Sequence, residues 1–199
     1  MDDVPRNSKQ ISTRIRHAER ALRREQERFG AIRDGAGKRY LLGPLYVLMG
    51  DTEGALRSFA WCAETFPDDS GEPLHLLCWT LALYRVGQTE QAAATLRQTM
   101  LSNLYLMPRL LGREQDVIDR WHPSNRSEKR YVDALPDEWF AVWEPSALAW
   151  VRTVYDSEPM RRVRERYIAI YTALQEEPPG PTRSQLVEEA FQLQYPTLQ

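Results

Sequence analysis

The sequence predicts an all-α protein. Apolar residues recur at steps of three and four along most of the chain, which is the spacing that lines one face of a helix. Prolines and glycines interrupt these runs where helices are expected to begin or end, and no run shows the strict alternation of a half-buried strand. With 199 residues, 42% of them hydrophobic and 27% charged, the chain is long enough to bury its own core and is typical of soluble globular proteins.

Residues 1–35 are expected to contribute a basic N-terminal helix. Its helical pattern runs from Ile11 to Phe29, and six arginines cover the remaining faces. Residues 1–40 carry eleven Lys or Arg and six Asp or Glu, so this end is basic while the rest of the chain is acidic. Three roles remain open: docking on the acidic body through the apolar face, pairing with a second copy, or binding phosphate. The apolar face consists of Ile11, Ile15, Ala18, Leu22 and Phe29.

A pattern of the form Gly-x-Thr-Glu-x-Ala then occurs twice. It begins at Gly50 and again at Gly87, thirty-seven residues later, each time between two apolar runs of helical spacing. Each glycine suits a tight turn that needs a left-handed backbone, and the polar residue after it can cap the next helix. The sequence therefore predicts two successive units of helix, turn and helix.

Residues 36–105 resemble two units of the tetratricopeptide-repeat (TPR) family. The first unit has the family's residues at the family's spacing, and the second is a degenerate copy that keeps Gly87, Ala92 and an apolar Leu96. Two units are fewer than such stacks normally need, so the flanking helices are expected to complete the core. The matching residues of the first unit are Leu42, Gly43, Tyr46, Gly50, Ala55, Phe59 and Pro67.

The resemblance implies a binding groove lined by the first helix of each unit, and hence a protein–protein interaction module or adaptor that binds a peptide or helix. Tyr40 and Pro44 stand where the family's clamp for a C-terminal carboxylate would begin, so that clamp is not expected. A mostly apolar groove needs an occupant, which is either the chain's own terminal helices, a partner or a second copy. The groove residues implied are Tyr40, Val47, Leu77, Leu81, Tyr84 and Arg85.

Pro44 falls inside the first helix of the first unit. A proline there removes one backbone hydrogen bond, so the helix is expected to bend or to begin late. A functional alternative is that the freed carbonyl of Tyr40 faces the groove and accepts a hydrogen bond from a ligand.

Residues 106–199 are expected to form a helical region that packs on the repeats as a cap. The patterns predict helices over 103–111, 136–143, 145–155 and 159–174, with a loop over 121–130. A last helix is expected to begin at a Thr182 cap with Gln185 in the capping-box position, and to bury Leu186, Val187, Ala190 and Phe191. A cluster of four tryptophans is interpreted as the core of this cap, or alternatively as an aromatic pocket: Trp121, Trp139, Trp143 and Trp150.

Residues that carry chemistry are scarce. The three histidines lie in separate segments, and no catalytic, phosphate-binding or dinucleotide motif occurs, so neither an enzyme nor a cofactor is expected. Glu72 and His75 beside two aspartates do not require a metal, and none is expected. Cys62 and Cys78 are interpreted as reduced core residues. The alternatives to protein binding are a nucleic-acid-binding regulator that uses the arginine-rich helices, and an enzyme with its site in the C-terminal third.

The expected location is the cytoplasm. The chain opens without the apolar segment of a signal peptide, and its longest apolar stretch is far shorter than the ~20 residues of a membrane span. The expected partner is a protein or peptide, with a homodimer possible. Nucleic acid is disfavoured because no aromatic residue is interleaved with the N-terminal arginines before Phe29.

Overall fold

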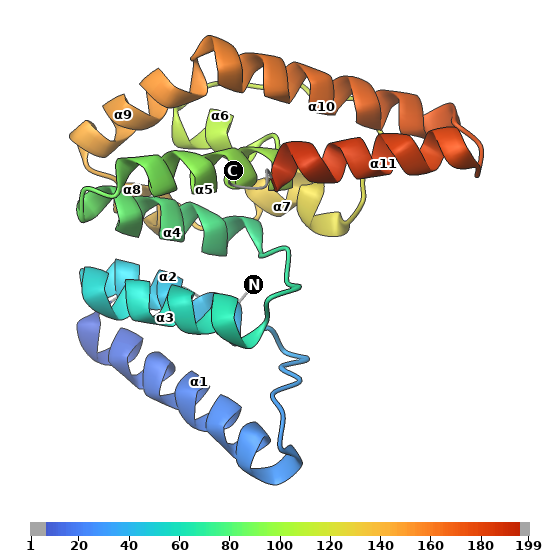
Figure 1. Cartoon of the computed structure of the whole chain (residues 1–199). Coiled ribbons are helices and arrows are strands. Elements are labelled where there is room, and N and C mark those ends of the chain that lie inside the picture. The colour runs from blue at the N-terminus through green and yellow to red at the C-terminus, as the bar shows by residue number, and fades with distance from the viewer. Residues whose placement is uncertain (1–6, 196–199) are drawn as a thin grey trace. The chain divides into compact units, whose positions relative to one another are not determined.

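The computed structural model describes residues 7–195, and within this range the chain forms eleven α-helices, one short 3-10 helix (η1) and no strand (Figure 1). The all-α prediction is confirmed. The opening residues on which the absence of a signal peptide was judged lie outside the described range. The helices are α1 (Ser8–Phe29), α2 (Arg39–Met49), α3 (Thr52–Thr65), α4 (Pro73–Arg85), α5 (Thr89–Ser102), α6 (Leu106–Leu110), η1 (Asn125–Ser127), α7 (Lys129–Asp133), α8 (Glu138–Ala141), α9 (Pro145–Tyr155), α10 (Glu158–Glu176) and α11 (Pro181–Gln194).

The described chain divides into two compact units. The first contains the residues up to Thr95 together with Pro136–Trp143, and the second contains Leu96–Leu135 together with the residues from Glu144 onward. This division differs from the predicted segments, because it falls inside α5 and therefore inside the predicted repeat region 36–105. Residues 136–143 also belong with the first unit, although the sequence placed them in the C-terminal region.

Helix α1 is capped at its N-terminus by Asn7, whose side-chain oxygen accepts a hydrogen bond from the Gln10 backbone N–H at 3.0 Å. Gly30 follows its last residue and has the left-handed backbone typical of a helix C-cap. Most of the predicted apolar face is buried, and the helix packs on α2. Phe29 is an exception at 54% exposed, so its predicted burial is wrong: the helix ends there and the side chain lies beyond the packed region. The buried residues are Ile11, Ile15, Ala18 and Leu22.

The two repeated glycines make the turns that the sequence predicts. Gly50 and Gly87 both have φ of 77°, a left-handed conformation that residues with a Cβ rarely adopt. After Gly50, the Asp51 carboxylate caps α3 by accepting the Gly54 N–H at 2.8 Å. The pairs α2–α3 and α4–α5 therefore form two successive units of helix, turn and helix, as expected.

Helices α2 and α3 approach each other closely because Gly43 has no side chain. A Cβ at this position would come within 2.2 Å of the Phe59 ring, which is itself fully buried. Pro44 lies inside α2 and is accommodated without ending the helix. The first unit thus has a tightly packed hairpin on which α1 docks from one side.

The C-terminal helices lie close to their predicted positions. Helix α9 has the predicted bounds and α10 is slightly longer than expected. Residues 121–130, predicted as a loop, contain η1 and the start of α7. The predicted start of the last helix is wrong, because α11 begins at Pro181 with Gly180 as its cap and no side-chain cap bond. Proline fixes the φ angle of a first helical turn, so the helix starts one residue before Thr182. Ala190 is buried as expected, whereas Val187 and Phe191 are 46% and 57% exposed.

The four clustered tryptophans are divided between the two units. Trp139 and Trp143 are buried and belong to the first unit, while Trp121 and Trp150 belong to the second. Trp121 stacks on Tyr171 with ring centroids 5.8 Å apart. The sequence analysis interpreted these four tryptophans as one core, whereas the structure assigns them to two units.

Candidate functional site

Four of the six predicted groove residues are buried in the protein. Leu77 and Leu81 are fully buried, Val47 is 1% exposed and Tyr40 is 9% exposed. They are buried because α2 and α4 pack directly against each other. Tyr84 and Arg85 are half-buried, and Arg85 Nη2 donates a hydrogen bond to the carbonyl of Val142 at 2.8 Å. These six positions therefore do not form an open apolar groove in this structure.

The Tyr40 carbonyl that Pro44 frees is satisfied inside the protein. Nδ1 of His75, on α4, lies 3.3 Å from this oxygen. Burial lowers the pKa of the imidazole to about 4, so His75 is neutral at pH 7 and Nδ1–H can donate to the carbonyl. The idea that the freed carbonyl serves a ligand is wrong, because the next helix pair supplies the donor.

A polar cluster next to this contact joins the start of α2 to the loop before α4. The buried carboxylate of Asp34 accepts the backbone N–H groups of Lys38 and Arg39, each at 2.8 Å. The Arg39 guanidinium and the Tyr40 hydroxyl both donate to Asp69, and these hydrogen bonds hold the pKa of Asp69 below its usual range despite burial. Each charged group of the cluster is hydrogen-bonded within it, so the cluster is explained by its role in holding two loops together.

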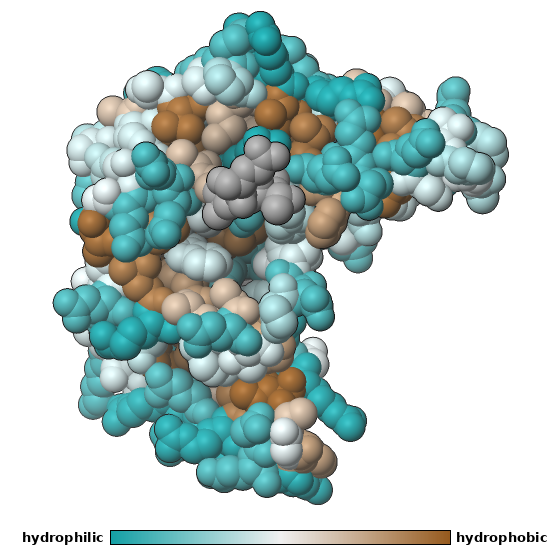
Figure 2. All heavy atoms as spheres, viewed as in Figure 1, coloured by the Kyte–Doolittle hydropathy of each residue, from teal (hydrophilic) through white to brown (hydrophobic). Residues whose placement is uncertain are grey.

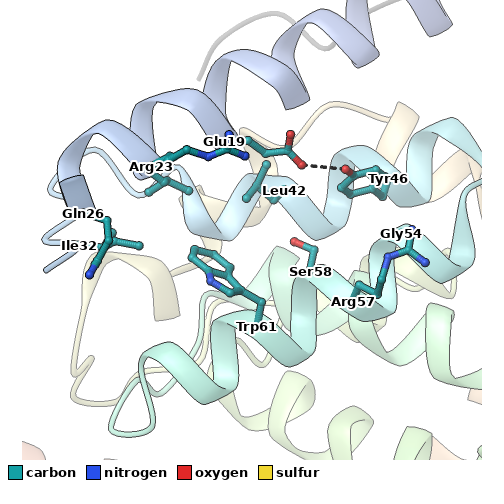
Figure 3. Close-up of a pocket in the computed structure, with 11 residues that line it drawn as sticks. Glu19, Arg23, Gln26, Ile32, Leu42, Tyr46, Gly54, Arg57, Ser58 and Trp61 are labelled. Carbon is teal, nitrogen blue, oxygen red and sulfur yellow. Dashed lines mark hydrogen bonds between the residues drawn. The ribbon is translucent and has the colours of Figure 1, made fainter. Parts of the chain in front are cut away.

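An unfilled groove lies between α1 and α3, with α2 at its base (Figure 3). We call it the α1/α3 groove; it belongs entirely to the first unit and has a volume of about 460 Å³. This volume is within the range of small-molecule and cofactor sites, roughly 300–1,000 Å³. The groove is lined by Glu19, Leu22, Arg23, Gln26, Ile32, Leu42, Tyr46, Gly54, Arg57, Ser58 and Trp61.

The base of the groove is apolar. Leu22 and Leu42 are buried, and Ile32 and Trp61 are half-buried with part of each side chain open to the groove. In Figure 3 the indole of Trp61 extends from α3 toward Ile32 and so forms one end of the groove. Figure 2 shows hydrophobic surface between the mostly hydrophilic α1 and the neighbouring helix α3. Water in contact with this surface can be displaced favourably by an apolar group.

Ser58 places an unsatisfied hydroxyl in this apolar setting. The residue is 8% exposed, and its Oγ has no hydrogen-bond partner within residues 7–195. A helical serine can bond back to the carbonyl four residues earlier, and Ser58 does not. Figure 3 shows the hydroxyl directed from α3 into the groove. Because buried polar groups are normally hydrogen-bonded, this oxygen is poised to pair with a polar group that enters the groove.

One wall of the groove is fixed by a contact between α1 and α2. The Tyr46 hydroxyl donates to Oε1 of Glu19 at 2.9 Å, and burial together with this bond raises the pKa of Tyr46 to about 12. Gly54 allows the ring to lie there, since a Cβ on Gly54 would come 2.7 Å from Tyr46 Cδ1. Tyr46 is therefore neutral, and the Glu19 carboxylate is already engaged.

A second cavity, of about 500 Å³, lies in the second unit, and four of the six charged residues that line it already have partners. Lys129 pairs with Asp133, Arg113 pairs with Asp156, and the Arg109 guanidinium donates to the carbonyls of Val132 and Leu135. The α1/α3 groove is the stronger candidate because Ser58 leaves a hydrogen bond unmade there.

Sequence reasoning did not find the α1/α3 groove. Its lining comes from three helices and the α1–α2 loop, and the contribution of α1 depends on how that helix docks. A weak signal was present on α3, where Gly54, Ser58 and Trp61 follow helical spacing on a face beside the buried Ala55, Phe59 and Cys62.

Comparison of the chain with protein-family models, with curated proteins and with solved structures found no match. Within residues 7–195, no helix combines the length and the apolar character that crossing a membrane requires, and no cluster of three or more potential metal ligands occurs.

Proposed function

We propose that this protein is a protein–protein interaction module that binds a peptide or helix of a partner in the α1/α3 groove. The observation that carries the proposal is the buried, unpartnered hydroxyl of Ser58 in a groove with an apolar base. A polypeptide offers both kinds of group that can bind here. Its apolar side chains can pack on Leu42 and Trp61, and a polar group can form a hydrogen bond with Ser58. Leaving such a hydroxyl unpaired costs about 1–3 kcal/mol, which a ligand can recover.

The proposal places the TPR-like helix pairs in the role of a scaffold. The pairs α2–α3 and α4–α5 carry the glycine turns on which the resemblance rests, and α1 docks beside the first pair. The proposed groove differs from the one that the resemblance implied, because it uses α1 and the second helix of a unit. Assignment to the TPR family and to the cytoplasm remains a prediction.

The chemistry of the lining favours binding over catalysis. The described residues that line the groove include neither histidine nor cysteine, so Ser58 has no imidazole beside it in the groove to activate it as a nucleophile. The carboxylate of Glu19 is occupied by Tyr46 and is not poised as a base. A binding role requires only shape, apolar surface and hydrogen-bonding groups, and these are present.

The proposal is tested by selecting a random-peptide phage library against the full chain and measuring the affinity of the selected peptides. The variant Ser58→Phe fills the groove and removes the hydroxyl. The matched control is Ala60→Phe, which adds the same ring at an exposed position of the same helix. Circular dichroism and thermal unfolding establish that both variants fold.

We expect selected peptides whose Kd rises at least about tenfold in Ser58→Phe, or ~1.4 kcal/mol, and stays within about twofold in Ala60→Phe. A selection that yields no binding peptide, or peptides that bind both variants equally, contradicts the proposal. If Ser58→Phe does not fold, Ser58→Ala and Trp61→Ala replace it, and their weaker binding relative to Ala60→Phe is the supporting result.

A further inference from the structure

Two arginines line the α1/α3 groove from opposite walls. Arg23 is on α1 and Arg57 is on α3, and both are exposed. Helix α1 as a whole carries seven Lys or Arg and three Glu, so the wall that it contributes is basic. The groove therefore combines an apolar base with two cationic groups at its rim (Figure 3).

The charges of these two arginines are poorly compensated. Arg23 makes no ion pair within the part of the chain that the structure describes. Arg57 pairs with Glu53 at 3.7 Å, but the two side chains are 72% and 88% exposed, and such a surface pair contributes little. Both guanidinium groups are thus available to a ligand.

The arginines of α10 show the contrast. Arg161 and Arg162 both pair with Glu158 on the same helix, and Arg166 pairs with Glu189 of α11. Arg161 and Arg162 share the one carboxylate of Glu158, and the fourth arginine of the helix, Arg164, donates to the Tyr155 carbonyl. Arg23 differs from the three paired arginines of α10 in that it contacts no carboxylate in the part of the chain that the structure describes.

We propose that the ligand of the α1/α3 groove is an acidic peptide, with an Asp or Glu side chain that pairs with Arg23 or Arg57 and an apolar side chain that packs on Leu42 and Trp61. This inference rests on the proposed function. Guanidinium groups form strong, directional hydrogen bonds with carboxylates, and the pairing gains from partial burial in the groove. Charge complementarity between the basic wall and the acidic side chain favours acidic peptides over apolar peptides that lack an acidic residue.

The composition of the groove favours a peptide over a nucleic acid. The Glu19 carboxylate lies on the same wall as Arg23 and would repel a continuous phosphate backbone, whereas a peptide can place its acid away from Glu19. Leu22, Leu42 and Ile32 offer an aliphatic base that suits aliphatic side chains. Binding of a polyanion to α1 as a whole would depend on all of its arginines and not on those that line the groove.

The test uses the peptide that binds most tightly in the selection and depends on Ser58, synthesised with an amidated C-terminus so that only side chains carry acid. A second peptide has every Asp and Glu replaced by Asn and Gln. Both are titrated against wild type, Arg23→Gln, Arg57→Gln and Arg24→Gln. Arg24 is exposed on α1 and does not line the groove, so it controls for the loss of one charge.

We expect the acidic peptide to lose about tenfold in affinity in Arg23→Gln or Arg57→Gln and less than about twofold in Arg24→Gln. The neutralised peptide should bind wild type and these variants equally. Peptides that depend on Ser58 but lack acidic residues, or that bind Arg23→Gln, Arg57→Gln and Arg24→Gln equally well, overturn this inference and leave the proposed function intact. A selection without peptides that depend on Ser58 overturns both.

A single-stranded DNA oligonucleotide is the competing probe. Under the acidic-peptide proposal it does not displace the peptide at physiological salt. The proposal is contradicted if the oligonucleotide displaces the peptide and its own affinity falls equally in Arg23→Gln and Arg24→Gln. That result would identify α1 as a nucleic-acid surface.

Discussion

At the scale of single residues, Pro44 and His75 form a matched pair. Proline removes the donor that would have bonded the Tyr40 carbonyl within α2, and the buried imidazole of α4 supplies a replacement at 3.3 Å. The arrangement requires His75 to remain neutral, because protonation would place a charge in the core. We therefore expect protonation of His75 to destabilise the contact between the two helix pairs.

The first prediction follows from the pKa of His75. It is about 4 in the folded protein and ~6.5 in the unfolded chain. Between these two pH values His75 is therefore protonated in the unfolded chain and neutral in the folded protein. The free energy of unfolding should therefore be unaffected by this group above pH 6.5 and fall by roughly 3 kcal/mol as the pH drops to 4. Urea unfolding measured between pH 7 and pH 4 checks the slope.

Substitutions of His75 and His17 isolate the contribution of His75 to the pH dependence of the unfolding free energy. His75→Gln keeps an N–H donor but does not titrate, so its unfolding free energy should depend less on pH than that of wild type over the same interval. His17→Gln, at an exposed position of α1, should retain the wild-type slope. Equal slopes for wild type and His75→Gln would show that His75 does not couple folding to pH.

At the scale of helices, the first hairpin depends on the absence of a side chain at Gly43. The fully buried ring of Phe59 occupies the space into which a Cβ would project, at 2.2 Å. The sequence indicated the turn glycines Gly50 and Gly87 through their repeated motif, and it placed Gly43 and Phe59 within the same resemblance. That Gly43 serves packing rather than a turn is visible only in the contact between α2 and α3.

The second prediction is that Gly43→Ala destabilises the protein although alanine favours helices. The methyl group must displace Phe59 or separate the two helices, and overpacking of this kind costs about 1–3 kcal/mol. Thermal or urea unfolding measures the loss. Gly35→Ala is the control, because nothing lies within 4 Å of a Cβ built there. A Gly43→Ala variant as stable as Gly35→Ala would mean that α2 and α3 are less tightly packed than the structure shows.

The bounds of the C-terminal helices could be predicted from the sequence better than their buried faces. Periodicity and punctuation predicted α9 at its observed bounds and α10 nearly so, since each begins with a proline in its first turn. The burial of α11 could not be predicted, because Val187 and Phe191 fit an apolar face whose neighbours the sequence does not reveal. The groove was missed for the same reason: its walls come from α1 and α3, and the unpaired state of Ser58 depends on every residue around it.

At the scale of the whole molecule, the described chain contains two compact units, and both cysteines belong to the first. Cys62 is 5% exposed and Cys78 is fully buried. Burial raises the pKa of Cys62 to about 11 and also raises that of Cys78, so neither thiol is ionised to a useful extent at pH 8. Their reaction with an external reagent therefore requires the first unit to open.

The third prediction is that both thiols react slowly with a disulfide reagent in the native protein. We expect rates more than about a hundredfold below those of the urea-unfolded chain, because labelling occurs only from opened states. Ala60→Cys adds an exposed thiol on α3 that should react at nearly the unfolded rate. Rapid labelling of both native cysteines would show that the core of the first unit is not closed.

The central claim, that the α1/α3 groove binds an acidic peptide, is tested most directly by mapping backbone amide chemical shifts of the full chain as the selected peptide is added. We predict that the largest changes fall on residues that line the groove, above all Ser58, Trp61 and Arg23. Changes centred instead on the exposed residues of α11, around Val187 and Phe191, would contradict the claim and place the binding surface in the second unit.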